Sequence, residues 1–343
     1  MSIKRKLAAS LVGLVFGLSS LEAIAAEKLR VSNWLPATEP LVIDVIQVWA
    51  DKVKEVTQGR VEVEIIPALG KPDAHFDLVK NGVADVAMGV DGYTADRFVL
   101  PYAFKLPFVA NSSTAASLAY WRTYKSHLEK HNEFAGVHLL GLWAHGPGLA
   151  LTTKRQLASM DDFRGLKLRV TGGAVQDIAA ALGATPQFAP VSQTYELLTR
   201  GVVDGAMLPL SAAVGFKVDT ALTQGFNVPG GLFRDTHYLI MNEARYKSLS
   251  AEDQKAIDGI SGEVLARLAG ASFDRGDKAA AEKMNAAGFK SVTASGAFLD
   301  EVKARLMPLQ EAWIARVGQK GIDGKAILSA FADEVKKAEA EAK

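Results

Sequence analysis

The sequence predicts an α/β protein with two lobes and a central cleft between them. Its 343 residues are enough for two domains of roughly 100 to 200 residues each. Strand and helix patterns alternate through the first hundred residues, as in a sheet with helical crossovers. Residues 81–88 and 200–207 also share one pattern, a helix that ends at Gly followed by an apolar strand. Such joints are common and coincidence is an alternative, but apolar helix positions precede both joints and favour two similar lobes.

The first 25 residues have the pattern of a secretory signal peptide. Basic residues at 4–6 precede an apolar run over 7–18, and small residues lead to a cleavage site near Ala25/Ala26. A membrane anchor is the alternative, but the run is shorter than the roughly 20 residues that cross a bilayer. The chain has 0 Cys, which excludes disulfides and a lipid anchor on cysteine. We therefore expect an exported, periplasmic protein with a Sec-type signal.

Alternating and apolar residues predict the elements of the first lobe. Strands are expected over 27–34, 60–67 and 83–90, and helices from Pro40 to Gly59 and over 75–80. This order is typical of a parallel sheet with right-handed crossovers.

The second lobe repeats this alternation. We expect strands over 166–170 and 185–188 and one beginning at Val202, with helices over 174–182 and 192–199, the latter capped by Ser192. Residues 238–241 form a strand that crosses back to the first lobe. A long helix from Ser250 to about Asn285, a strand over 289–292 and further helix with breaks at Pro308 and near 318–324 complete the chain, with a frayed end over 336–343.

These elements divide the chain into a signal peptide and two lobes. Lobe I is expected over 26–149 plus about 236–275, and lobe II over 150–235 plus about 276–343. Crossover strands and the long helix join the two lobes.

Composition and motifs exclude several classes of function. The net charge of +1, which becomes nearly neutral without residues 1–25, argues against a nucleic-acid partner. The six His residues show no metal-binding spacing, and His127 and His131 lie on a charged helix face. Neither a nucleophile elbow nor a phosphate-binding loop is present. We expect no enzyme activity, cofactor or metal.

Arg169 is the leading candidate for a functional side chain. In the strand over 166–170, Leu166, Leu168 and Val170 alternate with Lys167 and Arg169. Solvation is the ordinary fate of a charged strand residue. The alternative is that Arg169 points into the cleft and binds a carboxylate, because a guanidinium offers paired donors that match its two oxygens.

Other candidates lie where strands end, because ligands of open α/β sheets bind beyond the carboxyl ends of the strands. Tyr93 and the segment 208–211 each follow a strand of the repeated pattern. The loop 145–148 permits close approach of a ligand to its backbone, or serves as a hinge. Phe108 is equally explained as a core residue. The predicted ligand-binding set is Arg169, Tyr93, His145, Gly146, Phe108, Leu208, Ser211 and Phe233.

Several segments, in this order and spacing, resemble one known family. They read Asp-Gly-Tyr-Thr-Ala-Asp-Arg-Phe (91–98), Leu-Pro-Phe (106–108), Gly-Leu-Lys-Leu-Arg-Val (165–170), Gly-Val-Val-Asp-Gly-Ala (201–206) and Met-Asn-Glu-Ala-Arg-Tyr-Lys-Ser-Leu-Ser (241–250). The chain resembles the extracytoplasmic solute receptors of TRAP transporters, the tripartite ATP-independent periplasmic carriers.

The resemblance implies a periplasmic binding protein fold that closes around an organic acid and delivers it to the small and large integral-membrane subunits of a permease. It also implies that Arg169 forms a salt bridge to the ligand carboxylate. A receptor for an ATP-driven importer and a secreted α/β enzyme are the alternatives.

Two departures from the family pattern indicate the ligand. Ala150 and Leu208 stand where sugar-acid receptors of the family carry an Arg and an Asn. A buried site without partners for hydroxyls disfavours polyhydroxylated ligands, because each unpaired polar group costs roughly 1 to 3 kcal/mol. We therefore expect a monocarboxylate with a compact body, such as a keto or aromatic acid.

Overall fold

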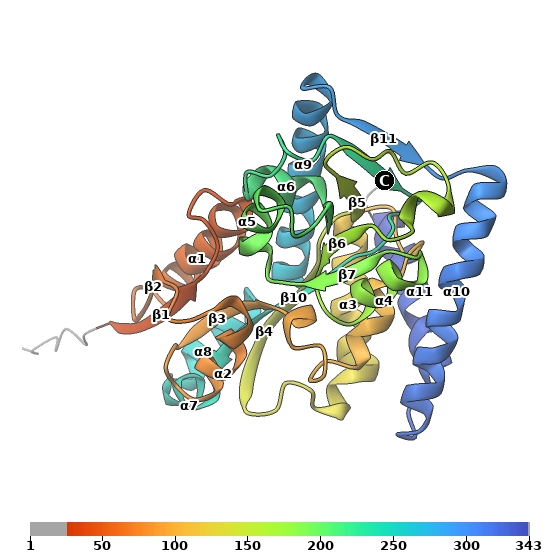
Figure 1. The fold of residues 1–343 in the computed structure, drawn as a ribbon. Coiled ribbons are helices and arrows are strands. Elements are labelled where there is room, and N and C mark those ends of the chain that lie inside the picture. The colour runs from red at the N-terminus through yellow and green to blue at the C-terminus, as the bar shows by residue number, and fades with distance from the viewer. Residues whose placement is uncertain (1–25, 342–343) are drawn as a thin grey trace, which may run out of the picture.

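The computed structural model describes residues 26–341 and consists of two lobes, each built on its own β-sheet (Figure 1). The predicted signal peptide and its cleavage site lie outside the described residues. The sheet of lobe I has the strand order β2-β1-β3-β10-β4, and the sheet of lobe II has the order β11-β9-β5-β8-β6-β7. The two-lobed α/β fold that the sequence predicts is confirmed. Within residues 26–341, no helix combines the length and the apolar character that crossing a bilayer requires.

The sheet of lobe I consists of three parallel strands from the start of the chain and two strands from later in the sequence. β1 (Glu27–Asn33) pairs in parallel with β2 (Val61–Pro67) and β3 (Val86–Val90), as predicted. β10 (Thr236–Asn242) then runs antiparallel between β3 and β4 (Val137–Ala144). The strand over 238–241 therefore does return to lobe I. The helices of this lobe are η1 (Leu41–Gln47), α1 (Val48–Val56), η2 (Pro72–Ala74), α2 (His75–Lys80), η3 (Asp91–Thr94), η4 (Leu100–Lys105), α3 (Ser113–Thr123), η5 (Tyr124–Leu128), η6 (Glu129–His131), α7 (Glu243–Ser248) and α8 (Ala251–Gly259).

Lobe II places the Arg169 strand inside its sheet. β6 (Lys167–Val170) lies between β7 (Thr185–Phe188) and β8 (Gly205–Leu208) and is parallel to both. β5 (Leu149–Thr152) pairs antiparallel with β8 and with β9 (Gln224–Asn227), which also pairs with β11 (Lys290–Thr293). The helices of this lobe are η7 (Met160–Phe163), α4 (Ala174–Ala181), η8 (Val191–Gln193), α5 (Thr194–Thr199) and α6 (Leu210–Gly215).

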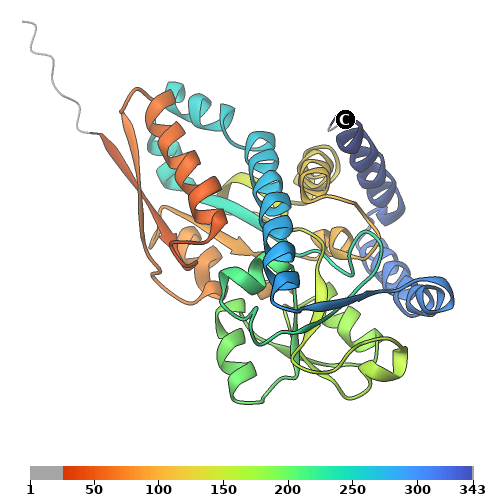
Figure 2. The same cartoon turned by 90° about the horizontal axis from the view of Figure 1, so that it is seen from above.

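Four connections join the lobes. The segments 145–148, 228–235 and 319–323 carry the chain across, and α9 (Glu263–Ala286) packs on α3 and β4 of lobe I and on α6 of lobe II. Seen from above, α9 runs between the two lobes (Figure 2).

The C-terminal helices depart from the predicted division of the chain. α10 (Gly296–Gly318) packs on α4 of lobe II, but α11 (Gly324–Glu341) packs on α3 of lobe I. The prediction that residues 324–341 belong to lobe II is therefore wrong. The break predicted at Pro308 is also wrong, since this residue lies inside α10. The predicted frayed end is helical as far as Glu341.

Other corrections have local physical causes. The long helix expected from Ser250 is broken at Gly262, where φ is +60° and a Cβ atom would lie 2.6 Å from the Trp121 ring. Ser250 does cap α8, since its hydroxyl accepts a hydrogen bond from the amide of Asp253. Ser192 does not cap α5, because the chain already turns in η8 and Gln193 precedes the helix.

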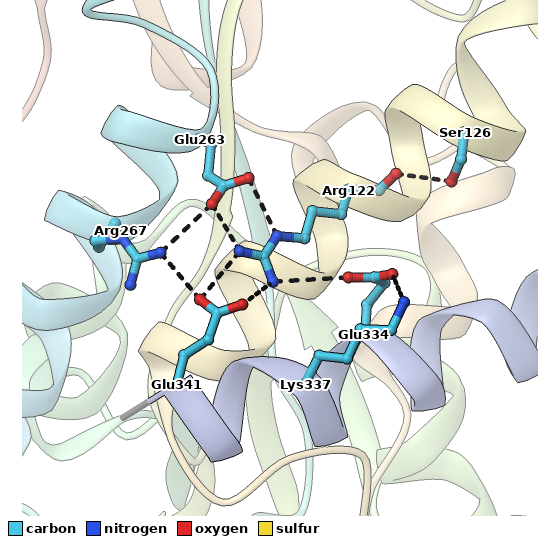
Figure 3. Close-up of polar contacts among 7 residues, drawn as sticks. All are labelled: Arg122, Ser126, Glu263, Arg267, Glu334, Lys337 and Glu341. Atoms are coloured by element: carbon cyan, nitrogen blue, oxygen red, sulfur yellow. Dashed lines mark hydrogen bonds and ion pairs between the residues drawn. The ribbon is translucent and has the colours of Figure 1, made fainter. Parts of the chain in front are cut away.

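Figure 3 shows a network of charged side chains that fastens α11 to lobe I. Arg122 on α3 donates two hydrogen bonds to Glu263 on α9, at 2.7 and 3.1 Å, and two to Glu341 on α11, at 2.8 and 3.1 Å. Arg267 also lies 3.2 Å from Glu341 and 3.4 Å from Glu263. Each of these charged groups contacts more than one partner, so the network stabilises the docking of α11 more than an isolated surface ion pair does.

We predict that Arg122→Gln lowers the free energy of unfolding by about 1 kcal/mol at low ionic strength, because one guanidinium joins three helices. Urea denaturation measures the loss, which should become smaller at about 1 M NaCl, where charges are screened within about 3 Å. Lys125→Gln is the matched control, since Lys125 forms a single exposed pair with Glu129. An equal loss in both variants contradicts a special role for the network.

Candidate functional site

A cavity lies between the lobes, beyond the carboxyl ends of β1, β3, β6 and β8. This is the position where open α/β sheets bind ligands. Aromatic and aliphatic side chains make up most of its wall. The lining residues are Trp34, Leu35, Glu39, Leu41, Met88, Val90, Tyr93, His145, Arg169, Thr171, Val191, Met207, Leu208, Pro209, Ala212, Phe216, Phe233, Asp235, His237 and Phe273.

Five of the eight predicted residues line this cavity, namely Arg169, Tyr93, His145, Leu208 and Phe233. Gly146, Ser211 and Phe108 do not. Gly146 and Ser211 instead surround the carboxylate of Asp277 on α9. A Cβ atom at Gly146 would overlap that carboxylate, and the amide of Ser211 donates to it at 2.8 Å. Phe108 is partly exposed on the surface, with its ring 5.9 Å from the ammonium of Lys303.

Arg169 is buried in the cavity wall without an acidic partner. Arg169 is 1% exposed, and its Nε donates to the carbonyl of Ala189 at 2.8 Å. The Nη2 atom is buried without a hydrogen-bond partner, and no ion pair within residues 26–341 includes Arg169. Burial lowers the pKa of Arg169, and Tyr93 and Asp235 oppose that shift. An arginine nevertheless stays charged in proteins, so this guanidinium needs an anion.

Tyr93 presents a second donor beside Arg169. Its hydroxyl oxygen accepts a hydrogen bond from the amide of Val191 at 3.0 Å, and its ring meets the edge of Trp34. Burial raises the pKa of Tyr93, so the phenol keeps its proton. Since Arg169 has no acceptor atom, that proton is available to a ligand oxygen.

The two histidines of the wall are neutral. The amide of Asp235 donates to Nε2 of His145 at 2.8 Å, so the ring proton lies on Nδ1, which donates to the carbonyl of Gly146 at 2.6 Å. Burial lowers the pKa of His145 to about 4 and that of His237 to about 3. Both rings therefore add aromatic surface, not positive charge, to the cavity.

A buried ion cluster includes Asp235, an acidic group of the cavity wall whose charge acts on Arg169. Lys105 lies 2.9 Å from Asp235 and also pairs with Asp91, whose carboxylate accepts a hydrogen bond from the hydroxyl of Thr236. Burial opposes ionisation of Asp235, but several favourable contacts, of which the charge of Lys105 is the largest, together hold the pKa of Asp235 below its ordinary value. The cluster leaves the charge of Arg169 free for a ligand.

Several wall residues, including Glu39, Asp235 and His237, are absent from the set predicted from the sequence. Glu39 follows the first strand, so the rule that selects Tyr93 also applies to it. Asp235 directly precedes β10, and His237 lies within it. The pairing of this strand with strands distant in the sequence brings both residues to the cleft. Ala150, one of the two departures, lies in the core of lobe II beside Met207 and Phe226 and does not line the cavity.

No three His, Asp or Glu side chains in the described part of the chain are arranged to share a metal ion. The polar side chains of the cavity wall offer hydrogen-bond donors and acceptors that suit direct contact with an organic ligand.

The fold and the cavity define a two-lobed solute-binding protein. The family model of the bacterial extracellular solute-binding proteins, family 7 (DctP), matches residues 31–316, and the chain belongs to this family. It is a solute receptor of the TRAP type, and the family comprises extracytoplasmic receptors, not enzymes.

Three relatives illustrate the similarity. A Comamonas testosteroni protein named outer membrane transporter protein TsaT is 32% identical over 305 residues, which are 88% of this chain and 90% of that protein. A TRAP periplasmic solute-binding protein from Bordetella bronchiseptica, solved with bound (R)-mandelate and (S)-mandelate, is 39% identical with a TM-score of 0.88, covering 90% of this chain and 99% of its own. A TRAP solute-binding protein from Rhodoferax ferrireducens with copurified benzoate is 29% identical with a TM-score of 0.86, covering 92% and 99%.

The neutral His145 predicts an acid-sensitive contribution to stability. Its pKa falls from 6.5 in the unfolded chain to about 4 on folding, so its contribution is full above pH 6.5 and is lost as the pH falls towards 4. The difference in free energy of unfolding between wild type and His145→Gln should therefore narrow by up to about 1.4 kcal/mol per pH unit below pH 6.5.

Urea denaturation at pH 7, 6 and 5 measures this difference. Buried carboxyls such as Glu133, whose pKa burial raises to about 7, have the opposite pH dependence, but they are common to both proteins and cancel. A difference that does not change with pH contradicts a neutral buried His145.

Proposed function

We propose that the protein is the TRAP receptor for a compact aromatic monocarboxylate, held by an ion pair between the ligand carboxylate and Arg169. The unpaired, buried guanidinium is the observation that carries this proposal. A bidentate carboxylate satisfies its remaining donors, and the hydroxyl of Tyr93 is placed to donate to the same group.

The charges of the wall favour a single carboxylate. Arg169 is the one cationic side chain that lines the cavity among the described residues, since His145 and His237 are neutral. Elsewhere the polar wall is acidic, with Glu39 and Asp235. A second carboxylate on the ligand would lose its hydration without finding a positive partner, which costs free energy.

Apolar residues of the wall favour a ring or a similarly compact body. Trp34, Phe216, Phe233 and Phe273 come from both lobes and enclose the cavity with aromatic surface. Such surface suits a flat apolar ligand. Relatives at 39% and 29% identity were solved with mandelate and benzoate, which are acids of this kind.

The setting of this function is also proposed from the family. The receptor would act in the periplasm after cleavage of the signal peptide near Ala25/Ala26 and deliver its ligand to the small and large integral-membrane subunits of a TRAP permease. The family match disfavours the ATP-driven importer and the secreted enzyme.

We predict that Arg169→Gln weakens the binding of benzoate and mandelate by about thirtyfold or more, because a charge-assisted bidentate contact is worth on the order of 2 kcal/mol. Isothermal titration calorimetry measures the change, with circular dichroism as a check of folding. Arg155→Gln, an exposed arginine of the same lobe, should bind like the wild type. Unchanged affinity in Arg169→Gln contradicts the proposal.

Ligand selectivity gives a separate prediction. Succinate and sialic acid should bind at least about tenfold more weakly than benzoate, because the second carboxylate of succinate lacks a cationic partner and the polar body of sialic acid does not match the aromatic wall. Competition calorimetry against benzoate measures the ratios. Tight binding of either compound contradicts the apolar, singly cationic cavity.

A further inference from the structure

Glu39 is a second polar group in the cavity, and it lies on the opposite lobe from Arg169. It occupies the segment between β1 and η1, where its amide donates to the carbonyl of Pro36 at 2.9 Å and its carbonyl accepts from the amide of Val42 at 2.9 Å. These contacts fix the backbone of Glu39 at the end of the first strand. The residue is 5% exposed, so its side chain is held in the wall and not in solvent.

The carboxyl group of Glu39 has no partner in the described protein. Its Oε2 atom is buried without a hydrogen bond, and the side chain takes part in no ion pair between residues 26 and 341. Buried polar groups are normally satisfied, and those that are not need an explanation. Burial raises the pKa of Glu39 to about 7, with no compensating charge beside it.

The opposite lobe is shaped to receive this carboxyl group. Oε2 lies against Gly215 at the end of α6, where a Cβ atom would overlap it. The φ of Gly215 is not positive. Glycine is therefore suited to this position because it lacks a side chain, not because its backbone is less restricted. The remaining wall residues near this end of the cavity, such as Leu41, Ala212 and Phe216, are apolar and offer Glu39 no hydrogen bond.

We propose that Glu39 is a specificity-determining residue that accepts a hydrogen bond from a hydroxyl or amino substituent on the ligand ring. This inference rests on the proposed function, with the ligand carboxylate at Arg169. Arg169 and Glu39 belong to different lobes and do not pair with each other, so one ligand bridges them with two groups of different chemistry. The preferred ligand is therefore a ring-substituted aromatic monocarboxylate, not the unsubstituted acid.

A ligand without such a substituent leaves the Glu39 carboxyl group unpaired in an apolar wall. Sites that are built to hydrogen-bond a substituent discriminate strongly against the analogue that lacks it. Thr171, Asp235 and His237 also have buried polar atoms without a partner in this wall, so variants of Glu39 are needed to isolate its contribution.

The test compares benzoate with 2-, 3- and 4-hydroxybenzoate by calorimetry on the full mature chain. For the wild type, at least one hydroxybenzoate should bind about tenfold tighter than benzoate or more. Glu39→Leu should remove this preference, so that benzoate and the hydroxybenzoates bind with similar affinities. Glu39→Gln should keep part of it, because an amide oxygen still accepts a hydrogen bond. Glu64→Leu, at an exposed carboxylate of the same lobe, is the matched control.

Gly215→Ala tests the same contact from the other lobe. The added methyl group displaces the Glu39 carboxyl group, so the hydroxyl preference should shrink while benzoate binding persists. Equal affinity of the wild type for benzoate and all three hydroxybenzoates overturns the inference, and so does a preference that survives in folded Glu39→Leu. Failure of the proposed function looks different, because then none of these acids binds or Arg169→Gln binds them as the wild type does.

Discussion

The burial of the Arg169 guanidinium without an internal carboxylate is the constraint on which the site depends. A buried charge is costly unless it is paired, and here the protein supplies one carbonyl, that of Ala189, and leaves Nη2 without a partner. Contacts between the lobes lie close by, since the amide of Val191 donates to Tyr93 and the amide of Gly172 donates to the carbonyl of Gly92 at 2.9 Å. The contacts that join the lobes therefore lie beside the unpaired guanidinium.

The surrounding charges are arranged so that they do not satisfy Arg169 from within. Asp235 also lines the cavity, but its carboxylate is bound by Lys105, which is shared with Asp91. Burial keeps His145 neutral, and its Nε2 accepts a hydrogen bond from the amide of Asp235. A cationic His145 would attract a second carboxylate, and an unpaired Asp235 would repel the first. The wall thus attracts a single anionic group, at Arg169.

The sequence predicts the elements whose cause is local, and fails where the cause is a distant contact. The Arg169 strand, the two lobes and the Tyr93 end of β3 follow from alternation and glycine stops. At the helix break, Gly262 lies against the Trp121 ring, and α11 docks through Phe331 on Phe104 as well as through the Arg122 network, so both features involve distant contacts that no local pattern shows. Gly146 and Ser211 do lie at the predicted strand ends, but Asp277 on α9 occupies the space beside them.

The connections between the lobes hold the two sides of the cavity in place. Both lobes contribute to its wall. Arg234 fixes one crossing segment, since it donates to the carbonyls of His145 and Ala110 at 2.9 and 2.7 Å. On α9, Asp274 accepts hydrogen bonds from lobe I, at Ser113 and Thr114, whereas Asp277 accepts from Ser211 of lobe II. These two carboxylates are one helical turn apart, so this part of α9 holds both lobes at once.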